Sequence, residues 1–164
     1  MKTLVYHGSN MAVEKPDIIV PNRFLDFGMG FYTTVYKKQA LDFAQKIVQR
    51  RKTGIATINI YEFDEENACD DCSVLRFKQD PDHEWLDFVT ANRSGEYTGK
   101  QFDIIIGPVA NDNVYRTIGL YMANVLTHDQ AVDTLKGREL FMQIAFTTKK
   151  ALSHLLFIGK EELS

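Results

Sequence analysis

Residues 28–34 encode a turn that leads directly into a strand. They read GMGFYTT: two glycines, an aromatic pair, then two β-branched residues that carry hydroxyl groups. Glycine permits positive φ and lets another group approach the backbone closely, and an aromatic ring beyond such a turn can serve as a platform for a ligand. The alternative is that Phe31 and Tyr32 both pack inside as core residues, because short glycine motifs carry little specificity.

The composition is that of a globular protein with one core. The chain has 164 residues, 45% hydrophobic and 25% charged, so we expect a single domain over residues 1–164. The net charge of −3 argues against a broad nucleic-acid surface. No apolar run approaches the roughly 20 residues that span a bilayer, and no charged-then-apolar leader opens the chain. We therefore expect a cytoplasmic protein without a membrane partner.

Helix and strand patterns are mixed along the chain without regular βαβ alternation, which predicts an α+β fold. Apolar periodicity and capping signals predict helices over residues 37–51, 82–93, 113–126, 127–135 and 149–154, with Gly137 ending the fourth. Alternating or continuous apolar stretches predict strands over residues 3–6, 31–34, 55–63, 73–78, 102–106, 140–146 and 155–159. A Gly107-Pro108 turn is expected to close the strand over 102–106.

The chain's two cysteines, Cys69 and Cys72, lie in an acidic Cys-Asp-Asp-Cys stretch. A structural zinc site commonly has four ligands, and no second cysteine pair follows, so no metal is expected here. A redox pair of the thioredoxin type would lie at a strand-to-helix junction, whereas residues 64–71 resemble a loop. We expect two reduced thiols at the protein surface.

The first predicted strand ends in Tyr6-His7-Gly8-Ser9. A lone histidine is commonly a hydrogen-bonded structural residue. His-Gly has a second use, however, because the imidazole can bond a ribose hydroxyl while glycine lets backbone N–H and C=O groups reach a carboxamide. An aromatic platform opposite would stack on the ring that carries this carboxamide.

These two stretches together resemble a known family. Tyr6-His7-Gly8 followed by Gly30-Phe31-Tyr32 looks like the first two motifs of the diphtheria-toxin and poly-ADP-ribose-polymerase branch of ADP-ribosyltransferases. Over nearly its full length, the chain is similar to a small bacterial family of uncharacterised ADP-ribosyltransferase-like proteins of the DUF3990 type. The stretches that carry this closer resemblance are residues 26–34, 84–88, 92–93, 103–112 and 143–146.

The resemblance implies both a fold and a function. The fold would be ADP-ribosyltransferase-like, with two small packed β-sheets, flanking helices and an NAD cleft. The function would be transfer of ADP-ribose from NAD to a macromolecular acceptor, as the toxin of a toxin–antitoxin pair with a small antitoxin partner. Cleavage of the glycosidic bond of NAD needs no metal, because nicotinamide leaves as a neutral molecule and the protein has mainly to orient the dinucleotide.

The resemblance also implies roles for individual residues. His7 would hold the ribose on the adenosine side, the backbone of Gly8 would clamp the nicotinamide amide, and Tyr32 would pack against the nicotinamide or its ribose. We expect the side chains of His7 and Tyr32 to line one cleft with Gly8; their placement on opposite faces of a sheet would count against NAD. We also expect a Gly8→Val variant to lose NAD affinity without losing stability.

Further expected cofactor contacts are Ser9, Gly30, Phe31, Phe43, Asn111 and Asp112. Tyr36 is the alternative to Phe43 as second aromatic, and Phe43 also falls on an apolar helical stripe, where it would be a core residue. Asn111 and Asp112 follow a buried strand, and such residues are also favoured as helix N-caps.

The third motif departs from the family pattern. The related enzymes carry a glutamate on a late strand, and the matching position here is Gln143. An amide can bond a ribose hydroxyl, but without charge it stabilises a cationic transition state less and cannot act as a general base. The alternatives are a non-catalytic NAD- or ADP-ribose-binding module and a structural or interaction domain. We expect Gln143 to lie across from Tyr32, with Met142 and Ile144 directed to the core.

Overall fold

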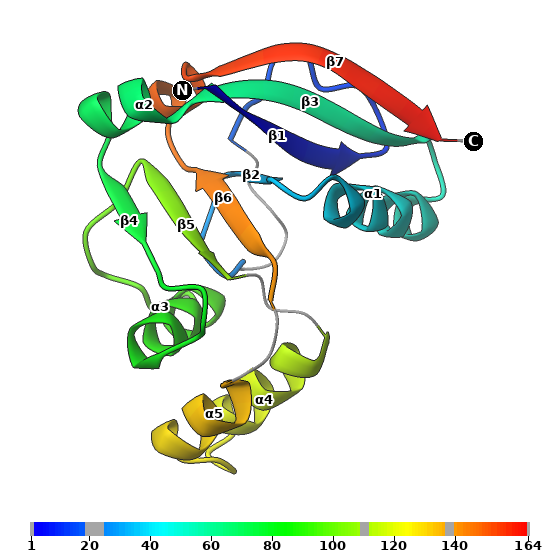
Figure 1. Cartoon of the computed structure of the whole chain (residues 1–164). Helices are drawn as coiled ribbons and strands as arrows, with labels where there is room; N and C mark the ends of the chain where they lie inside the picture. Colours follow the sequence, from blue (N-terminus) through cyan, green and yellow to red (C-terminus); the bar gives the residue numbers. More distant parts are fainter. Residues whose placement is uncertain (1, 19–24, 109–111, 137–139, 164) are drawn as a thin grey trace.

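A single seven-stranded sheet forms the centre of the computed structural model, in the order β4-β5-β6-β2-β1-β3-β7 (Figure 1). The structure describes residues 2–18, 25–108, 112–136 and 140–163. The strands are β1 (Lys2–Ser9), β2 (Phe31–Thr34), β3 (Ala56–Asp64), β4 (Val74–Arg76), β5 (Ile104–Pro108), β6 (Met142–Phe146) and β7 (Leu155–Leu163). The helices are α1 (Lys37–Arg51), α2 (Glu65–Asp71), α3 (His83–Arg93), α4 (Asp112–Met122), α5 (His128–Leu135) and α6 (Lys149–Leu152).

The structure confirms the α+β class but replaces the expected two small sheets with one mixed sheet. β4 and β5 are parallel, and the other neighbouring strands are antiparallel. The two halves of the sheet meet at β1 and β2, whose register pairs Tyr6 with Thr34 alone. Each of these strands pairs along its whole length with its other neighbour, β1 with β3 and β2 with β6. A single residue pair is therefore what joins the halves into one sheet.

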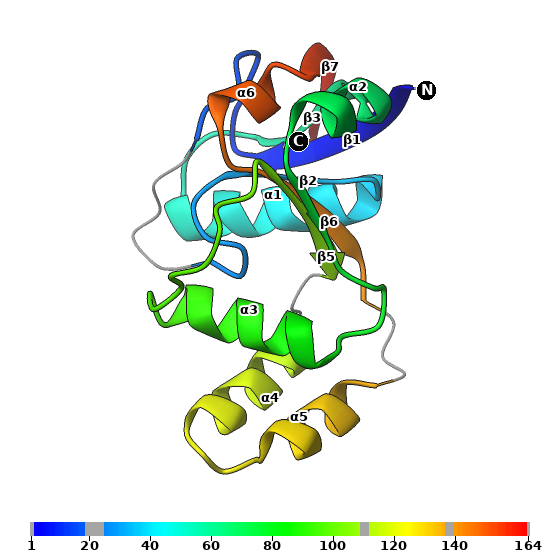
Figure 2. The same cartoon turned by 90° about the vertical axis from the view of Figure 1, so that its left-hand side faces the viewer.

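Helices cover both faces of the sheet, and each face has its own core. Figure 2 shows α1, α3, α4 and α5 below the sheet and α2 and α6 above it. We call the lower side the α1 face and the upper side the α2 face. The core of the α1 face includes Phe27, Trp85, Leu86, Val89, Ile105, Val114, Ile118, Ala131, Val132, Leu135 and Ala145. The core of the α2 face includes Val5, Phe31, Tyr61, Phe63, Ala68, Ile104, Ile106, Ile144, Phe146, Ala151 and Leu152.

The apolar period of α1 predicts the helix and most of its buried side. The helix spans Lys37–Arg51 and buries Ala40, Ala44 and Ile47. Phe43 is an exception, because 47% of its surface is exposed, so its assignment to the core is wrong. The expected capping box at the start of α5 is confirmed, with Thr127 and Gln130 bonding each other's backbone N–H groups. The expected helix end at Gly137 lies outside the described residues.

The acidic stretch after β3 is a helix, α2, rather than a loop. Asp64 caps it by accepting a hydrogen bond from the backbone of Asn67, and the first turn is acidic, which suits the positive end of a helix. The change alters the environment of the cysteines. Cys69 is exposed as expected, but Cys72 follows the helix and is buried in the core of the α2 face, so its assignment to the surface is wrong.

The expected turn at Gly107-Pro108 is a continuation of β5, in register with Gln143 and Met142 of β6. An added Cβ at Gly107 would lie 3.0 Å from atoms of Phe27 and Phe77, so close packing explains the glycine.

Among the residues that the structure describes, no helix combines the length and apolar character needed to cross a bilayer.

Candidate functional site

The three segments that carry the family resemblance come from adjacent strands. His7 and Gly8 lie on β1, Tyr32 lies on β2, and Gln143 lies on β6, with β2 between the other two. Thr34 of β2 pairs with Tyr6 on one side and with Gln143 on the other. Sequence segments that are far apart in the chain are thus neighbours in the fold.

His7 is a buried histidine that connects β1 to β2 where the two strands separate. Its Nδ1 lies 2.6 Å from the backbone oxygen of Tyr32, 25 residues away, and its ring stacks on Phe31 at 4.1 Å. Burial lowers the pKa of His7 to about 4, although the bond to the Tyr32 backbone partly opposes this. The imidazole is therefore neutral near pH 7 and donates its Nδ1 proton to the carbonyl oxygen.

The neutral state of His7 predicts a loss of stability in acid. An unfolded histidine titrates near 6.5, so as the pH falls the unfolded chain takes up a proton before His7 does. The contribution of neutral His7 to the free energy of unfolding is therefore complete above pH 6.5. It is lost between pH 6.5 and about 4, by about 3 kcal/mol in total. We expect NMR titration of the His7 ring to give a midpoint near 4; a midpoint near 6.5 would contradict the buried, neutral assignment.

Tyr32 lies on the opposite face of the sheet from His7. Its ring packs against the core of the α1 face, whereas His7 stacks on Phe31 in the core of the α2 face. The Tyr32 hydroxyl donates to the carbonyl oxygen of Gly28 at 2.5 Å and accepts from the N–H of Phe27 at 3.2 Å. The expectation that the two side chains line one cleft is therefore wrong, because alternate residues of paired strands point to opposite faces.

Gly8 lies on the α1 face, directly against helix α1. An added Cβ would lie 2.1 Å from the carbonyl oxygen of Ala40 and 2.9 Å from the backbone nitrogen of Ala44. The backbone of α1 thus fills the place of a side chain. The expectation that a Gly8→Val variant keeps its stability is wrong, because valine cannot fit without displacing the helix.

The other expected cofactor contacts have different surroundings. Phe31 is completely buried and packs against His7 and Tyr61, so it is a core residue and its assignment as a cofactor contact is wrong. Ser9 is buried, and its hydroxyl donates to the Asn10 side chain at 3.4 Å. An added Cβ at Gly30 would lie 3.0 Å from a backbone oxygen of β6, so the close approach there is between strands.

The two candidates for the second aromatic are both exposed. Phe43 lies on the outer side of α1, and Tyr36 precedes that helix with 39% of its surface exposed. The Tyr36 ring lies 5.0 Å from the ring of Phe141, which precedes β6 and is also exposed. Asn111 lies outside the described residues, and Asp112 begins α4 with a side chain that is likewise not described.

Gln143 lies on the α1 face, which is also the face of the Tyr32 ring, and carries an unpaired buried amide. Met142 and Ile144 contact the core of the α2 face, which confirms the predicted alternation along β6. Gln143 is directly opposite Thr34 rather than Tyr32, but it is a diagonal neighbour of Tyr32, which pairs with Ala145. Its exposed fraction is 9%, and its Nε2 has no hydrogen-bond partner in the described structure. Buried polar groups without partners are rare, so this one calls for a ligand or water.

A partly buried ion pair lies on the same face, near Tyr32. Arg93 Nη1 lies 3.3 Å from Asp26 Oδ1, and the guanidinium lies over the ring of Tyr115 at 4.1 Å. Burial, with contributions from Asp26 and Tyr115, raises the pKa of Tyr32 and keeps its phenol neutral. Sequence reasoning placed Asp26 and Arg93 in separate family-like segments without joining them. Only their opposite charges could have suggested a pair, because 67 residues separate them.

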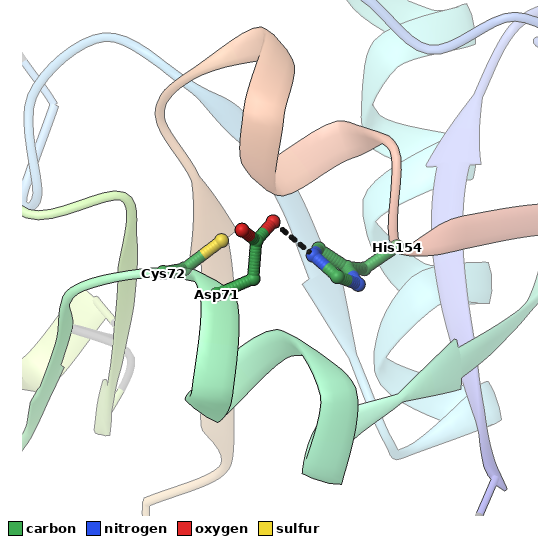
Figure 3. Close-up of side chains that lie close together, drawn as sticks. All are labelled: Asp71, Cys72 and His154. Carbon is green, nitrogen blue, oxygen red and sulfur yellow. Dashed lines mark hydrogen bonds and ion pairs between the residues drawn. The ribbon is translucent and has the colours of Figure 1, made fainter.

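A second cluster joins the end of α2 to the turn before β7 (Figure 3). Asp71, Cys72 and His154 offer ligand atoms within 4.8 Å of one another. His154 Nε2 lies 2.9 Å from one oxygen of Asp71, and Lys150 Nζ lies 3.7 Å from the other. Burial, reinforced by the charge of Asp103, raises the pKa of the Cys72 thiol. Cysteine binds a metal as the thiolate, which the raised pKa disfavours, and Lys150 already balances the charge of the Asp71 carboxylate. This cluster is therefore best described as a set of ion pairs that connects α2 to the turn before β7.

One family model matches most of the chain. The model is described as "Protein of unknown function (DUF3990)" and matches residues 3–157. No curated protein and no solved structure matches the chain significantly. The match confirms the closer of the two resemblances, and the relationship to ADP-ribosyltransferases stays a prediction.

Proposed function

We propose that this chain, which belongs to the DUF3990 family of unknown function, transfers ADP-ribose from NAD to a macromolecular acceptor. The reacting part of the dinucleotide would lie on the α1 face, next to Gln143 and Tyr32. The observation that carries the proposal is the buried Gln143 amide, whose Nε2 lacks a partner at the position where the resemblance expects a ribose contact. A ribose hydroxyl oxygen is an acceptor that could satisfy it.

The chemistry asks little of the protein beyond positioning. When the bond between nicotinamide and ribose breaks, nicotinamide leaves with the bonding electrons as a neutral molecule, and positive charge develops on the ribose. The protein must hold the dinucleotide in place and stabilise that charge. The Gln143 amide would fix the ribose, and the adjoining Tyr32 ring would pack against it or against the nicotinamide.

His7 takes a different role in this proposal from the one the resemblance implies. Its side chain lies on the α2 face, away from Gln143, so it does not share a pocket with Tyr32. Its bond to the Tyr32 backbone oxygen instead holds the segment of β2 that carries the Tyr32 ring. We therefore assign His7 as a positioning residue, and the separation of the two side chains weighs against a cofactor pocket formed by both.

The second candidate is a non-catalytic module that binds NAD or ADP-ribose. The neutral Gln143 side chain favours it, because an amide can bind a ribose hydroxyl without supplying the charge that assists bond cleavage. Both candidates require the same ligand on the same face, and only turnover separates them.

Titration calorimetry with NAD, followed by chromatographic detection of free nicotinamide, tests the proposal. We expect NAD to bind and nicotinamide to be released, and we expect Gln143→Ala to lower kcat about 100-fold while raising the Kd for NAD by much less. Gln49→Ala, which alters an exposed glutamine near the end of α1, is the matched control and should behave as wild type. Binding without release would favour the module, and absence of binding would leave a structural or interaction domain.

A further inference from the structure

The first residues of α3 and α5 are both histidines, and their rings lie side by side. Asp82 caps α3 by accepting from the backbone N–H of Trp85, and the Thr127 capping box fixes the start of α5. The two helices share the core of the α1 face. The His83 and His128 ring centres are 4.3 Å apart. Two capped helices on one core thus hold two imidazoles at the protein surface in a defined geometry.

Two ring nitrogens of this pair, one from each histidine, face each other. Nδ1 of His83 and Nδ1 of His128 face each other within hydrogen-bonding distance. The outer nitrogen of His128, Nε2, lies 2.8 Å from Asp87 Oδ1, which places the proton there and leaves a lone pair on Nδ1. The outer nitrogen of His83, Nε2, lies at an ion-pair distance of 3.5 Å from Asp129 Oδ1. When His83 also carries its proton on the outer nitrogen, two lone pairs face each other, and a cation bound by both nitrogens would relieve the repulsion. The two solvent-accessible rings would move slightly apart to bind it, because two nitrogens at about 2.0–2.1 Å from one Zn²⁺ are farther apart than two hydrogen-bonded nitrogens.

We propose that this cluster is a binding site for a divalent transition metal ion of the Zn²⁺ class. His83, His128 and Asp129 offer ligand atoms that lie within 4.8 Å of one another. Imidazole and carboxylate are usual zinc ligands, and a three-ligand site at the surface keeps a fourth position for water. Asp87 is then the outer carboxylate that orients a ligating histidine, an arrangement that is typical of metal sites.

The charges distinguish this cluster from the one at Asp71. There, Lys150 lies 3.7 Å from the carboxylate, and the third group is a buried thiol with a raised pKa. Around His83 and His128, the carboxylates of Asp87 and Asp129 form no ion pair with a lysine or arginine among the described residues. The two histidine side chains are 51% and 32% exposed, so an ion can reach them directly from solvent. Bound metal would tie α3 to α5 and stabilise that end of the protein.

Metal titration of the whole chain tests the proposal, after any histidine tag and all metal have been removed. We expect one equivalent of Zn²⁺ to bind and to raise Tm. Loss of a ligand in His83→Gln should weaken Zn²⁺ binding about 100-fold or more, and Asp87→Asn should weaken it about 10-fold. Co²⁺ should give visible d–d bands without a thiolate-to-cobalt charge-transfer band, because the proposed ligands are nitrogen and oxygen alone.

His154→Gln is the matched control, because it removes a histidine from the other cluster and should leave Zn²⁺ affinity unchanged. Asp129→Asn changes a side chain that is 87% exposed, so it tests the site even if a histidine variant folds poorly. The proposal is overturned if the wild type binds no Zn²⁺, in which case a proton shared by the two imidazoles explains their contact. It is equally overturned if binding survives His83→Gln but is lost in His154→Gln.

Discussion

Gly8→Ala is expected to lower the free energy of unfolding by about 3 kcal/mol, at the upper end of the range for an overfilled core. The added Cβ would meet the carbonyl oxygen of Ala40 at 2.1 Å and the nitrogen of Ala44 at 2.9 Å. Both are backbone atoms, so no side-chain rotation can make room, and α1 must move away from β1. Urea denaturation monitored by circular dichroism measures the change as a shift in midpoint with an unchanged slope.

Gly159→Ala is the control for this variant. Gly159 lies in β7, where an added Cβ would meet nothing within 4 Å, so we expect a change within about 0.5 kcal/mol. If both variants were equally stable, α1 would lie farther from β1 than it does here. If Gly8→Ala proved stable but lost NAD binding, Gly8 would serve the ligand rather than the helix.

The fold class and the start of α5 could be predicted from sequence because their signals are local. A capping box and an apolar period involve residues a few positions apart. The predicted bounds of α1 and α5 therefore agree closely with those in the structure. The helix α2 had equally local signals in Asp64 and the acidic first turn. A short helix with one buried residue shows no apolar period, however, so a prediction from apolar periodicity assigns this stretch to a loop.

The relative orientation of His7 and Tyr32 could not be predicted, because it depends on strand register. Each strand alternates its side chains between the two faces, so the pairing of Tyr6 with Thr34 decides which residues share a face. A shift of one residue would have put both side chains on the same side. That register pairs residues distant in the chain, so no local pattern in either strand encodes it.

The ion pairs Asp26–Arg93 and Asp71–His154 could not be predicted either, because they too depend on long-range packing. Both join residues whose separation in sequence is 67 or more. Charge alone gives many possible partners for each of them, and only the packing of α3 and of the turn before β7 selects one. Sequence could therefore nominate Gln143 by its position in a motif, but not its unpaired amide, which depends on every neighbour that surrounds it.

Gln143→Glu is expected to create or raise cleavage of NAD by about 100-fold. Glutamate has nearly the shape of glutamine, so the variant places a carboxylate where the unpaired amide now lies, beside the ribose in the proposed complex. Its negative charge would stabilise the positive charge that develops on the ribose as nicotinamide leaves. In the ground state that positive charge is on the nicotinamide ring instead, so a carboxylate beside the ribose stabilises the ground state much less. The effect should therefore appear in kcat rather than in the Kd for NAD.

The pH dependence of this variant identifies the carboxylate as the cause. Position 143 is 9% exposed, and burial disfavours a charged carboxylate, so the introduced group should titrate above the usual range for glutamate. Nicotinamide release should then rise with pH as the group ionises, a dependence that Gln143→Ala lacks. The urea denaturation midpoint of each variant, compared with that of wild type, shows whether the buried charge destabilises the protein. Wild type and Gln143→Glu could both bind NAD and yet release no nicotinamide. Residue 143 would then not be next to the reacting ribose, and both the enzyme and the binding interpretations of Gln143 would be wrong.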